Sequence, residues 1–443
     1  MRIPVRFCLA LCLHVGTLFV STAHAQTGFE KPPVLQAKDV LPELLLKGSF
    51  HEVDSRVTND GYFNEFTLRS KFGDFKVEGQ QLLELRIGEL NALNELDQLS
   101  SSKVIGDAVY EGGKATVLAP VNVVKKVAKT VSDPDKMYDT VKAVPDGAEK
   151  VFSWAYRQAK GAAQGVSDLV TGDSQTSSKE VSDGASSTLQ AGKNFGLRFI
   201  GYTGRERELF RKLQVNPYSS NRILQDEVVR VAGLGTAVGF AFRFVPGLGL
   251  LGQLTTFNRW YGRAEQLSLY EDPDVIKEKN KAELRALDVP DDMIEQFQKS
   301  KAYNPWTRRF VTASMTALGP SVAGRSLFIK AALQAKNEPS TLYFVSVAEY
   351  LEKIQKETPL KKIVSSLYVP AGVTKKGVLI VPLSVDYLFW TQEVGGIFDD
   401  FKARVTKEES FSSVEIHVRG RVSARAMTAL QSLGAKVTEN AWK

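Results

Sequence analysis

The first 25 residues indicate the cellular compartment in which this chain folds. Arg2 and Arg6 precede a short apolar run from Phe7 to Val20, and the sequence A-H-A ends at Ala25. A charged start, a short apolar segment and small residues around a cleavage site are typical of a secretory signal peptide. The apolar run is shorter than the roughly 20 residues that span a bilayer. We therefore expect residues 1–25 to be removed and the protein to be exported to the periplasm or the cell envelope.

Cysteine and histidine content excludes several kinds of chemistry. Both cysteines, Cys8 and Cys12, lie in the signal, so the exported chain contains no cysteine. A disulfide-linked partner, thiol catalysis and a cysteine-ligated metal are therefore excluded. Only His51 and His417 follow the signal, so no site can hold a metal with three histidines. We expect no cofactor and no resident metal.

The charge balance bears on the kind of partner. The formal net charge is +7 over 443 residues, and the basic residues are spread along the chain. A nucleic-acid-binding protein usually gathers basic residues into one strongly charged face. The sequence therefore argues against a nucleic-acid partner.

Hydrophobic periodicity predicts a mixed α+β fold that is mostly α-helical. Residues 26–48 are polar and proline-containing, which indicates an extended lead-in. Residues 49–163 predict a β-hairpin followed by amphipathic helices. The hairpin has a tight turn at Asp60-Gly61, and a leucine stripe follows over residues 80–100. Residues 164–194 are rich in Ser, Thr, Gly and Asp and predict a flexible linker.

The second half predicts a helical domain and then a small α+β module. The helical domain covers residues 195–357 and the α+β module covers residues 358–443. Helices are expected at residues 274–287, 291–299, 306–318, 323–336, 340–356 and 423–433. Strands are expected at residues 362–369, 377–383, 413–418 and 435–438.

A glycine-rich apolar stretch from Val228 to Phe257 is the most distinctive segment. Gly235 and Gly239 are spaced for close helix approach, and Pro246-Gly247 divides the stretch into a helical hairpin. Aromatic and basic residues at the end of an apolar run suit a bilayer interface. The proposed membrane or partner contacts are Gly235, Gly239, Arg243, Gly247, Trp260 and Arg263. The alternative is a hairpin buried at the centre of the helical domain.

Several weaker patterns have ordinary structural explanations. Ser219-x-Asn221 has the spacing of one motif of the penicillin-binding enzymes, but it lies in a predicted polar loop. The acidic clusters at residues 271–274 and 291–292 fall at predicted helix starts, where carboxylates favour the helix dipole. Asp399-Asp400 forms a third acidic pair. The basic amphipathic segments 121–130 and 148–160 suit either a core or an anionic membrane.

His417 is the better of the two candidate general bases. On a strand it shares one face with Glu415 and Arg419, which gives either a Glu-His pair or the solvated face of a sheet.

The sequence leads to two hypotheses about function. The first is a non-enzymatic envelope protein that binds a membrane surface or a protein partner through the glycine-rich hairpin and the basic helices. The second is a periplasmic hydrolase using carboxylates or His417.

Overall fold

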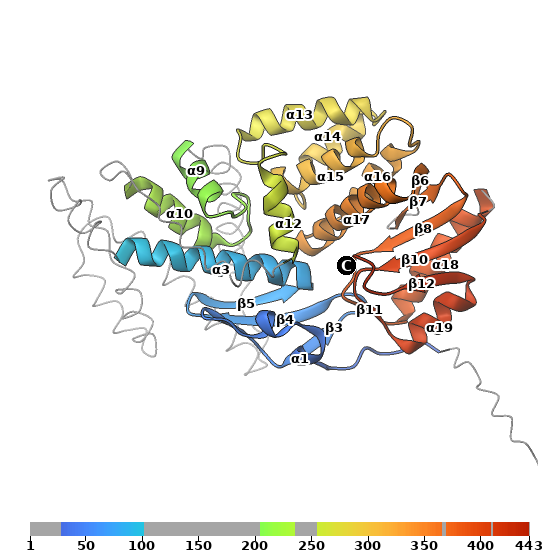
Figure 1. Cartoon of the computed structure of the whole chain (residues 1–443), viewed down its shortest axis with the longest axis horizontal. Coiled ribbons are helices and arrows are strands. Elements are labelled where there is room, and N and C mark those ends of the chain that lie inside the picture. Colours follow the sequence, from blue (N-terminus) through green and yellow to red (C-terminus); the bar gives the residue numbers. More distant parts are fainter. Residues whose placement is uncertain (1–27, 102–203, 235–254, 366–368, 409–410, 443) are drawn as a thin grey trace, which may run out of the picture.

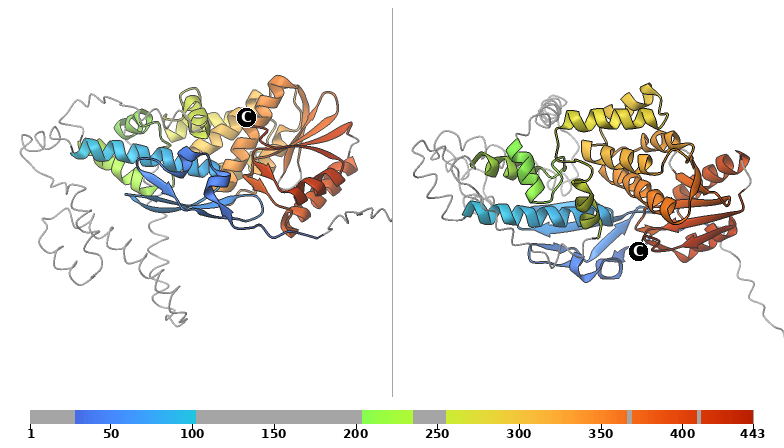
Figure 2. Two further views of the ribbon diagram at one scale, coloured as in Figure 1. Left: turned by 60° about the horizontal axis from the view of Figure 1, so that its bottom comes forward. Right: turned by 45° about the horizontal axis from the view of Figure 1, so that its top comes forward.

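The computed structural model describes residues 28–101, 204–234, 255–365, 369–408 and 411–442. These residues form a mixed α+β fold, as predicted (Figures 1 and 2). The predicted signal peptide, the predicted linker, both basic amphipathic segments and most of the glycine-rich stretch lie outside the described residues. No helix within the described ranges is both long and apolar enough to cross a membrane.

An antiparallel sheet forms the N-terminal part of the fold. Its order is β1-β3-β4-β2, and β5 also pairs with β4. The strands are β1 Leu35–Gln36, β2 His51–Val53, β3 Arg56–Asn59, β4 Asn64–Ser70 and β5 Gly73–Glu78. Two short helices, α1 Ala37–Val40 and α2 Glu43–Leu46, lie where an extended lead-in was expected. They form because Leu41 and Leu45 can turn inward and reach the core.

The predicted hairpin turn is present but longer than expected. Strands β3 and β4 pair up to Asn59 and Asn64. Asp60 Oδ1 accepts hydrogen bonds from the backbone N–H groups of Tyr62, at 2.9 Å, and Phe63, at 2.7 Å. This side-chain acceptor stabilises a wider loop in place of a tight two-residue turn. The backbone carbonyl of Tyr62 then accepts from Asp386 N at 3.0 Å, so the loop docks on the C-terminal sheet.

Helix α3 Gln80–Ser101 is the predicted leucine-rich helix. It packs on β4 and β5 and also contacts α10 Arg222–Leu234, α12 Thr255–Ala264 and α17 Glu338–Glu357. Figure 1 shows it running between the N-terminal sheet and the helical layer. The polar side of α3 is therefore covered as well, and its buried charged residues require ion-pair or hydrogen-bond partners within the protein.

The helical layer follows the predicted boundaries closely. Its remaining helices are α9 Gly204–Lys212, α13 Pro273–Ala286, α14 Asp291–Lys299, α15 Pro305–Ala317 and α16 Arg325–Ala332. Asn304 and Asn337 form capping boxes with Thr307 and Ser340, which fixes the starts of α15 and α17. Asp272 caps α13, and Asp291 lies in the first turn of α14, so these acids act at helix starts as predicted.

The C-terminal part is a five-stranded mixed sheet in the order β12-β10-β8-β7-β6. Strands β8, β10 and β12 are parallel, whereas β6 and β7 run antiparallel. The strands are β6 Leu360–Ser365, β7 Pro370–Thr374, β8 Val378–Leu383, β10 Ser413–Val418 and β12 Ala435–Thr438. Two short strands, β9 Tyr387–Leu388 and β11 Arg421–Val422, pair in parallel beyond β8 and β10.

This sheet separates two hydrophobic cores. Ile380 of β8 faces the large core that α17 shares with α3 and the N-terminal sheet. Its neighbours Leu379 and Val381 face a smaller core. That core is covered by α18 Gln392–Glu408 and α19 Ala424–Ser432. The alternation follows from the two-residue period of a strand. Residues predicted as an N-terminal module and as a helical domain therefore share one core.

Candidate functional site

The carboxyl ends of the three parallel strands open on one cavity. Residues 384–386 follow β8, residues 419–421 follow β10, and Asn440 lies beyond β12. Backbone hydrogen bonds join these loops, from Arg421 N to Asp386 O at 3.0 Å and from Asn440 N to Gly420 O at 2.9 Å. In open α/β sheets, ligands bind outside the carboxyl ends of parallel strands. A cavity of about 480 Å³ lies here, which we call the arginine cavity.

Other parts of the chain complete the walls of the arginine cavity. The α1–α2 segment, the start of α3 and the start of α12 contribute to its lining. Its charged residues are Lys38, Asp39, Glu84, Arg259, Asp386, Arg419 and Arg421. Apolar groups, including Leu41, Leu45 and Trp442, form the rest of the surface. The site therefore combines concentrated charge with apolar walls.

Gly420 lets the two strand-end loops pack directly on each other. A Cβ atom at this position would lie 1.9 Å from the backbone carbonyl oxygen of Asp386. Any side chain would force the loops apart. The contact holds Arg419 and Arg421, on either side of the glycine, at the wall of the cavity.

Arg419 is a largely buried cation with weakly engaged N–H donors. Its side chain is 13% exposed, and its nearest carboxylate oxygens are Asp386 Oδ1 at 3.6 Å and Glu84 Oε1 at 3.8 Å. Both distances exceed those of ordinary hydrogen bonds. Burial lowers the pKa of the Arg419 guanidinium; Asp386 and Glu84 raise it, and the nearby Arg259 lowers it. Arginine stays protonated in proteins, so an anionic group within hydrogen-bond distance would stabilise this buried charge.

Arg259 of α12 is a second arginine at the wall of the cavity, and its side chain is 35% exposed. Its Nε lies 3.2 Å from Glu349 Oε2. However, Nε and Nη2 are buried and form no hydrogen bond with any described residue. Buried donors of this kind are rare, because leaving one unsatisfied costs about 1–3 kcal/mol. An anion in the cavity beside Arg259 and Arg419 would reduce the repulsion between the two guanidinium groups.

The carboxylates near these arginines are engaged in holding the scaffold. Asp386 Oδ2 accepts from the backbone N–H groups of Asn64, at 3.1 Å, and Gln80, at 2.9 Å. Glu84 Oε2 accepts from the backbone N–H of Thr256 at 2.8 Å. Burial raises the pKa of Asp386, while Arg419 lowers it. These contacts fix the starts of α3 and α12 beside the cavity.

Two of the residues predicted to meet a membrane lie inside the protein. Trp260 is only 2% exposed, and its Nε1 donates to Glu349 Oε2 at 2.9 Å. Arg263 forms ion pairs with Glu349, at 3.3 Å, and Glu352, at 3.0 Å. Their aromatic and basic character therefore serves an internal contact with α17, which corrects their assignment to a bilayer interface. Gly235, Gly239, Arg243 and Gly247 lie outside the described residues.

His417 forms the predicted pair with Glu415, at 3.1 Å from Nε2 to Oε2. Its other ring nitrogen, Nδ1, lies 2.9 Å from the hydroxyl oxygen of Tyr350 on α17. Trp442 stacks on Tyr350 with 3.8 Å between ring centroids. This face of the sheet is covered by α17 and is not the solvated face expected as the alternative. Both imidazole nitrogens therefore have partners within the protein.

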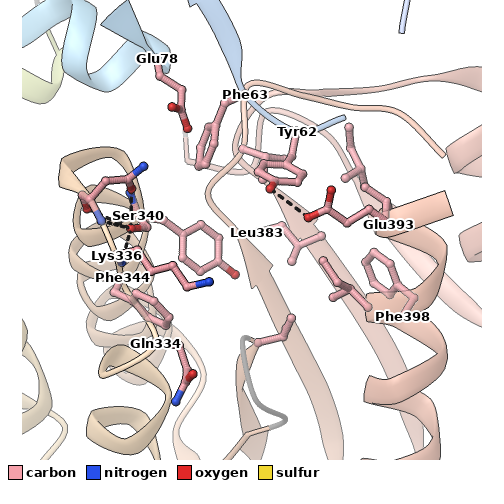
Figure 3. A pocket seen from close by; sticks show the side chains of 17 residues that line it. Tyr62, Phe63, Glu78, Gln334, Lys336, Ser340, Phe344, Leu383, Glu393 and Phe398 are labelled. Carbon is pink, nitrogen blue, oxygen red and sulfur yellow. Dashed lines mark hydrogen bonds between the residues drawn. The ribbon is translucent and has the colours of Figure 1, made fainter. Parts of the chain in front are cut away.

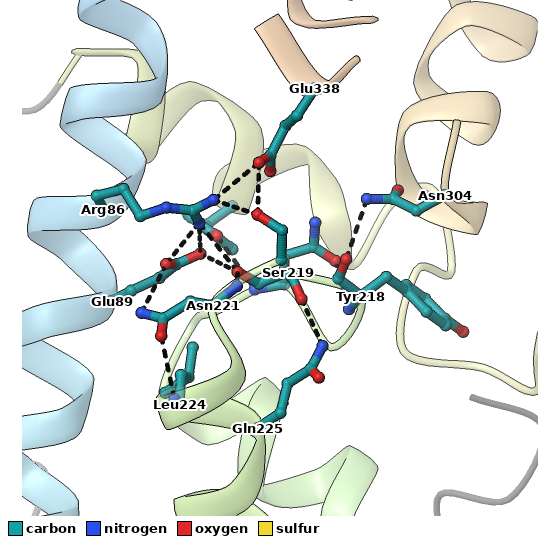
Figure 4. Close-up of polar contacts among 12 residues, drawn as sticks. Arg86, Glu89, Tyr218, Ser219, Asn221, Leu224, Gln225, Asn304 and Glu338 are labelled. Carbon is teal, nitrogen blue, oxygen red and sulfur yellow. Dashed lines mark hydrogen bonds and ion pairs between the residues drawn. The ribbon is translucent and has the colours of Figure 1, made fainter. Parts of the chain in front are cut away.

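Ser219 and Asn221 belong to a buried polar network (Figure 4). Arg86 of α3 donates to Glu89 Oε2 at 2.7 Å, to Ser219 Oγ at 3.1 Å and to Glu338 Oε2 at 2.8 Å. Asn221 Nδ2 donates to Glu89 Oε2 at 3.1 Å. Ser219 is buried and its hydroxyl donates to Glu89, so the network serves to join three segments of the chain.

The remaining acidic pair, Asp399-Asp400, lies in the middle of α18 and not at a helix start. Among the described residues, no three His, Asp or Glu side chains are grouped to hold a metal ion. Comparison with models of known protein families, with curated proteins and with solved structures found no match. The function must therefore be inferred from the geometry of the site.

Proposed function

We propose that this chain is an exported, non-enzymatic binding protein that takes a small anionic ligand into the arginine cavity. One observation carries the proposal: Arg259 and Arg419 line the same cavity, and the carboxylate oxygens nearest to Arg419 lie 3.6 and 3.8 Å away, beyond the distance of an ordinary hydrogen bond. A phosphate or carboxylate group matches the planar, forked donors of arginine. The apolar walls favour a ligand that also carries a hydrocarbon portion.

The composition of the cavity supports binding over hydrolysis. Its described lining includes no serine or histidine, and its buried carboxylates are held by backbone N–H groups. A nucleophile paired with a general base is the arrangement that hydrolysis would use. We therefore favour the binding hypothesis over the hydrolase alternative.

Inorganic phosphate and citrate are suitable probes of the arginine cavity. We expect either anion to bind the protein in isothermal titration calorimetry. Arg259→Gln should weaken binding about tenfold to a hundredfold, because each charged hydrogen bond contributes about 1.5–3 kcal/mol. Arg419→Lys should weaken it while keeping a positive charge beside Asp386 and Glu84, so this variant should remain folded.

Arg285→Gln is the matched control, because Arg285 is an exposed arginine on α13 that pairs with Asp291. It should bind both anions like the unmodified protein. Equal affinities in all three variants, with circular dichroism showing that each is folded, would exclude the arginine cavity as the anion site.

The second part of the proposal concerns location and the glycine-rich stretch. We propose that residues 1–25 direct export and that the hairpin of Val228–Phe257, with Gly235, Gly239, Arg243 and Gly247, contacts a membrane surface or an envelope partner. Its glycines, its apolar character and the adjacent basic residues support this proposal.

Liposome flotation tests the membrane contact. Protein lacking residues 1–25 should float with vesicles that contain anionic lipid, and Gly239→Leu should reduce the floating fraction severalfold because bulk would separate the helical arms. Gly396→Leu on α18 is the matched control, because Gly396 is exposed and a Cβ atom there would meet no other atom within 4 Å. Protein that stays in the soluble fraction at low salt would exclude a lipid surface as the partner.

A further inference from the structure

A second cavity, of about 490 Å³, lies between α17, α18, β8 and the β3–β4 loop (Figure 3). Most of its wall is apolar. The principal wall residues are Phe63, Phe344, Leu383, Leu388, Ile397 and Phe398. Val385 lines both this cavity and the arginine cavity, so the chain just beyond β8 separates the two. We call the second one the acidic-mouthed cavity, for the residues that line its rim.

Carboxylates dominate the charge at the rim. Glu78 comes from the end of β5 and Glu393 from the start of α18, and Figure 3 shows both beside the cavity. Tyr62 donates its hydroxyl hydrogen to Glu393 Oε1 at 3.3 Å. Asp60 lies in the same loop as Tyr62 and Phe63. Only Lys336 opposes these charges among the described lining residues, and it is exposed.

The negative charges at the rim raise the pKa values of two groups that line it. The pKa of Glu78 is raised by burial and by the negative charges of Asp60, Glu65 and Asp386. The pKa of the Tyr62 phenol is raised by burial and by Asp60, Glu393 and Glu78. A positive ligand at the rim would reverse the effect of these charges.

Aromatic rings complete the environment for a cation. Tyr62 and Phe63 lie side by side at the rim, with ring centroids 5.2 Å apart. The faces of aromatic rings attract ammonium groups, and a nearby carboxylate adds a direct ion pair. The apolar walls below cannot ligate a bare metal ion, but they can enclose a hydrocarbon group.

We propose that the acidic-mouthed cavity binds a small organic cation with an apolar body, of the alkylammonium or arylammonium class. The ammonium group lies at the rim with Glu78, Glu393 and the Tyr62–Phe63 rings. The hydrocarbon group fills the space lined by Leu383, Ile397 and Phe398. This site is independent of the anion site proposed above, because the two cavities present opposite charges to their ligands.

Octylammonium and octanoate form a matched pair of probes, with the same chain and opposite charge. In calorimetric titrations of the protein without residues 1–25, octylammonium should bind saturably and octanoate should bind at least about tenfold more weakly. Glu393→Gln and Glu78→Gln should each weaken octylammonium binding about tenfold. Ile397→Trp fills the cavity without changing its charge and should abolish binding.

Glu278→Gln removes an exposed carboxylate on α13 and should leave octylammonium binding unchanged. Arg419→Lys should also leave it unchanged, and Ile397→Trp should leave phosphate binding unchanged, so the two sites can fail separately. The proposal is overturned if octylammonium does not bind. It is also overturned if octanoate binds more tightly and loses that affinity in Lys336→Gln, which would assign the cavity to an anionic amphiphile.

Discussion

Arg86→Met is expected to lower the free energy of unfolding by about 3–5 kcal/mol, the usual cost of removing one partner of a buried ion pair. The side chains of Arg86 and Glu89 are 9% and 3% exposed, so water cannot replace the lost contact. Glu89 would be left with a buried charge and only the neutral donors Ser219 and Asn221. Glu338 at the start of α17 would lose its ion pair as well.

Urea unfolding followed by circular dichroism measures this loss. The control is Arg211→Met, because Arg211 forms an exposed pair with Glu208 at the same sequence spacing, and that change should cost at most about 1 kcal/mol. In the double variant Arg86→Met/Glu89→Leu, both charges are gone. The double variant should therefore be no less stable than Arg86→Met alone. Strictly additive losses would contradict the idea that an uncompensated charge is the cause.

Elements with strong local signals were predicted well from the sequence. The expected helix 291–299 and the expected strand 435–438 coincide with α14 and β12. A proline followed by two acids starts the helix, and Gly434 with a positive φ of 84° separates α19 from β12. Such features act within a few residues, so the sequence alone contains the information.

Elements whose patterns depend on their surroundings were missed. Strand β7 reads P-A-G-V-T and is buried at every position, so it has no alternation of polar and apolar residues. Helix α18 contains Gly395-Gly396, which lowers its intrinsic helix propensity. Both elements form because the tertiary structure places an apolar surface beside them.

The arginine cavity could not be predicted as a site for a related reason. Its residues come from segments spread between Lys38 and Trp442, and only the tertiary structure, including the parallel order of β8, β10 and β12, brings them together. The sequence placed Arg419 on the same face as His417 but gave no sign of Arg259 nearby. The signal that was available is R-G-R directly after a strand, with a glycine that permits close packing.

The sequence around Trp260 is compatible with two different environments, a bilayer interface and a buried contact. An aromatic residue between two arginines after an apolar run fits a bilayer interface, but it also fits a buried contact with acids. The deciding residues, Glu349 and Glu352, lie on α17, far away in the sequence. Burial raises the pKa of Glu349, whereas Arg259 and Arg263 lower it.

Trp260→Ala should therefore act on stability, with an expected loss of about 3–5 kcal/mol in the free energy of unfolding. The indole packs against Phe310 with 5.5 Å between ring centroids, and its removal leaves a cavity under α12. Trp260→Phe keeps most of this packing but removes the hydrogen bond to Glu349, so it should cost only about 1–3 kcal/mol.

Urea unfolding of both variants and liposome flotation of their folded fractions distinguish a buried Trp260 from one that contacts the membrane. A buried indole has no surface to offer a membrane, so the folded Trp260→Phe variant should float with anionic vesicles as the unmodified protein does. A variant with unchanged stability and reduced flotation would instead move Trp260 to the surface. Because α12 begins at the C-terminal end of the glycine-rich stretch, that result would also mean that α12 leaves its place against α17 when the membrane is bound.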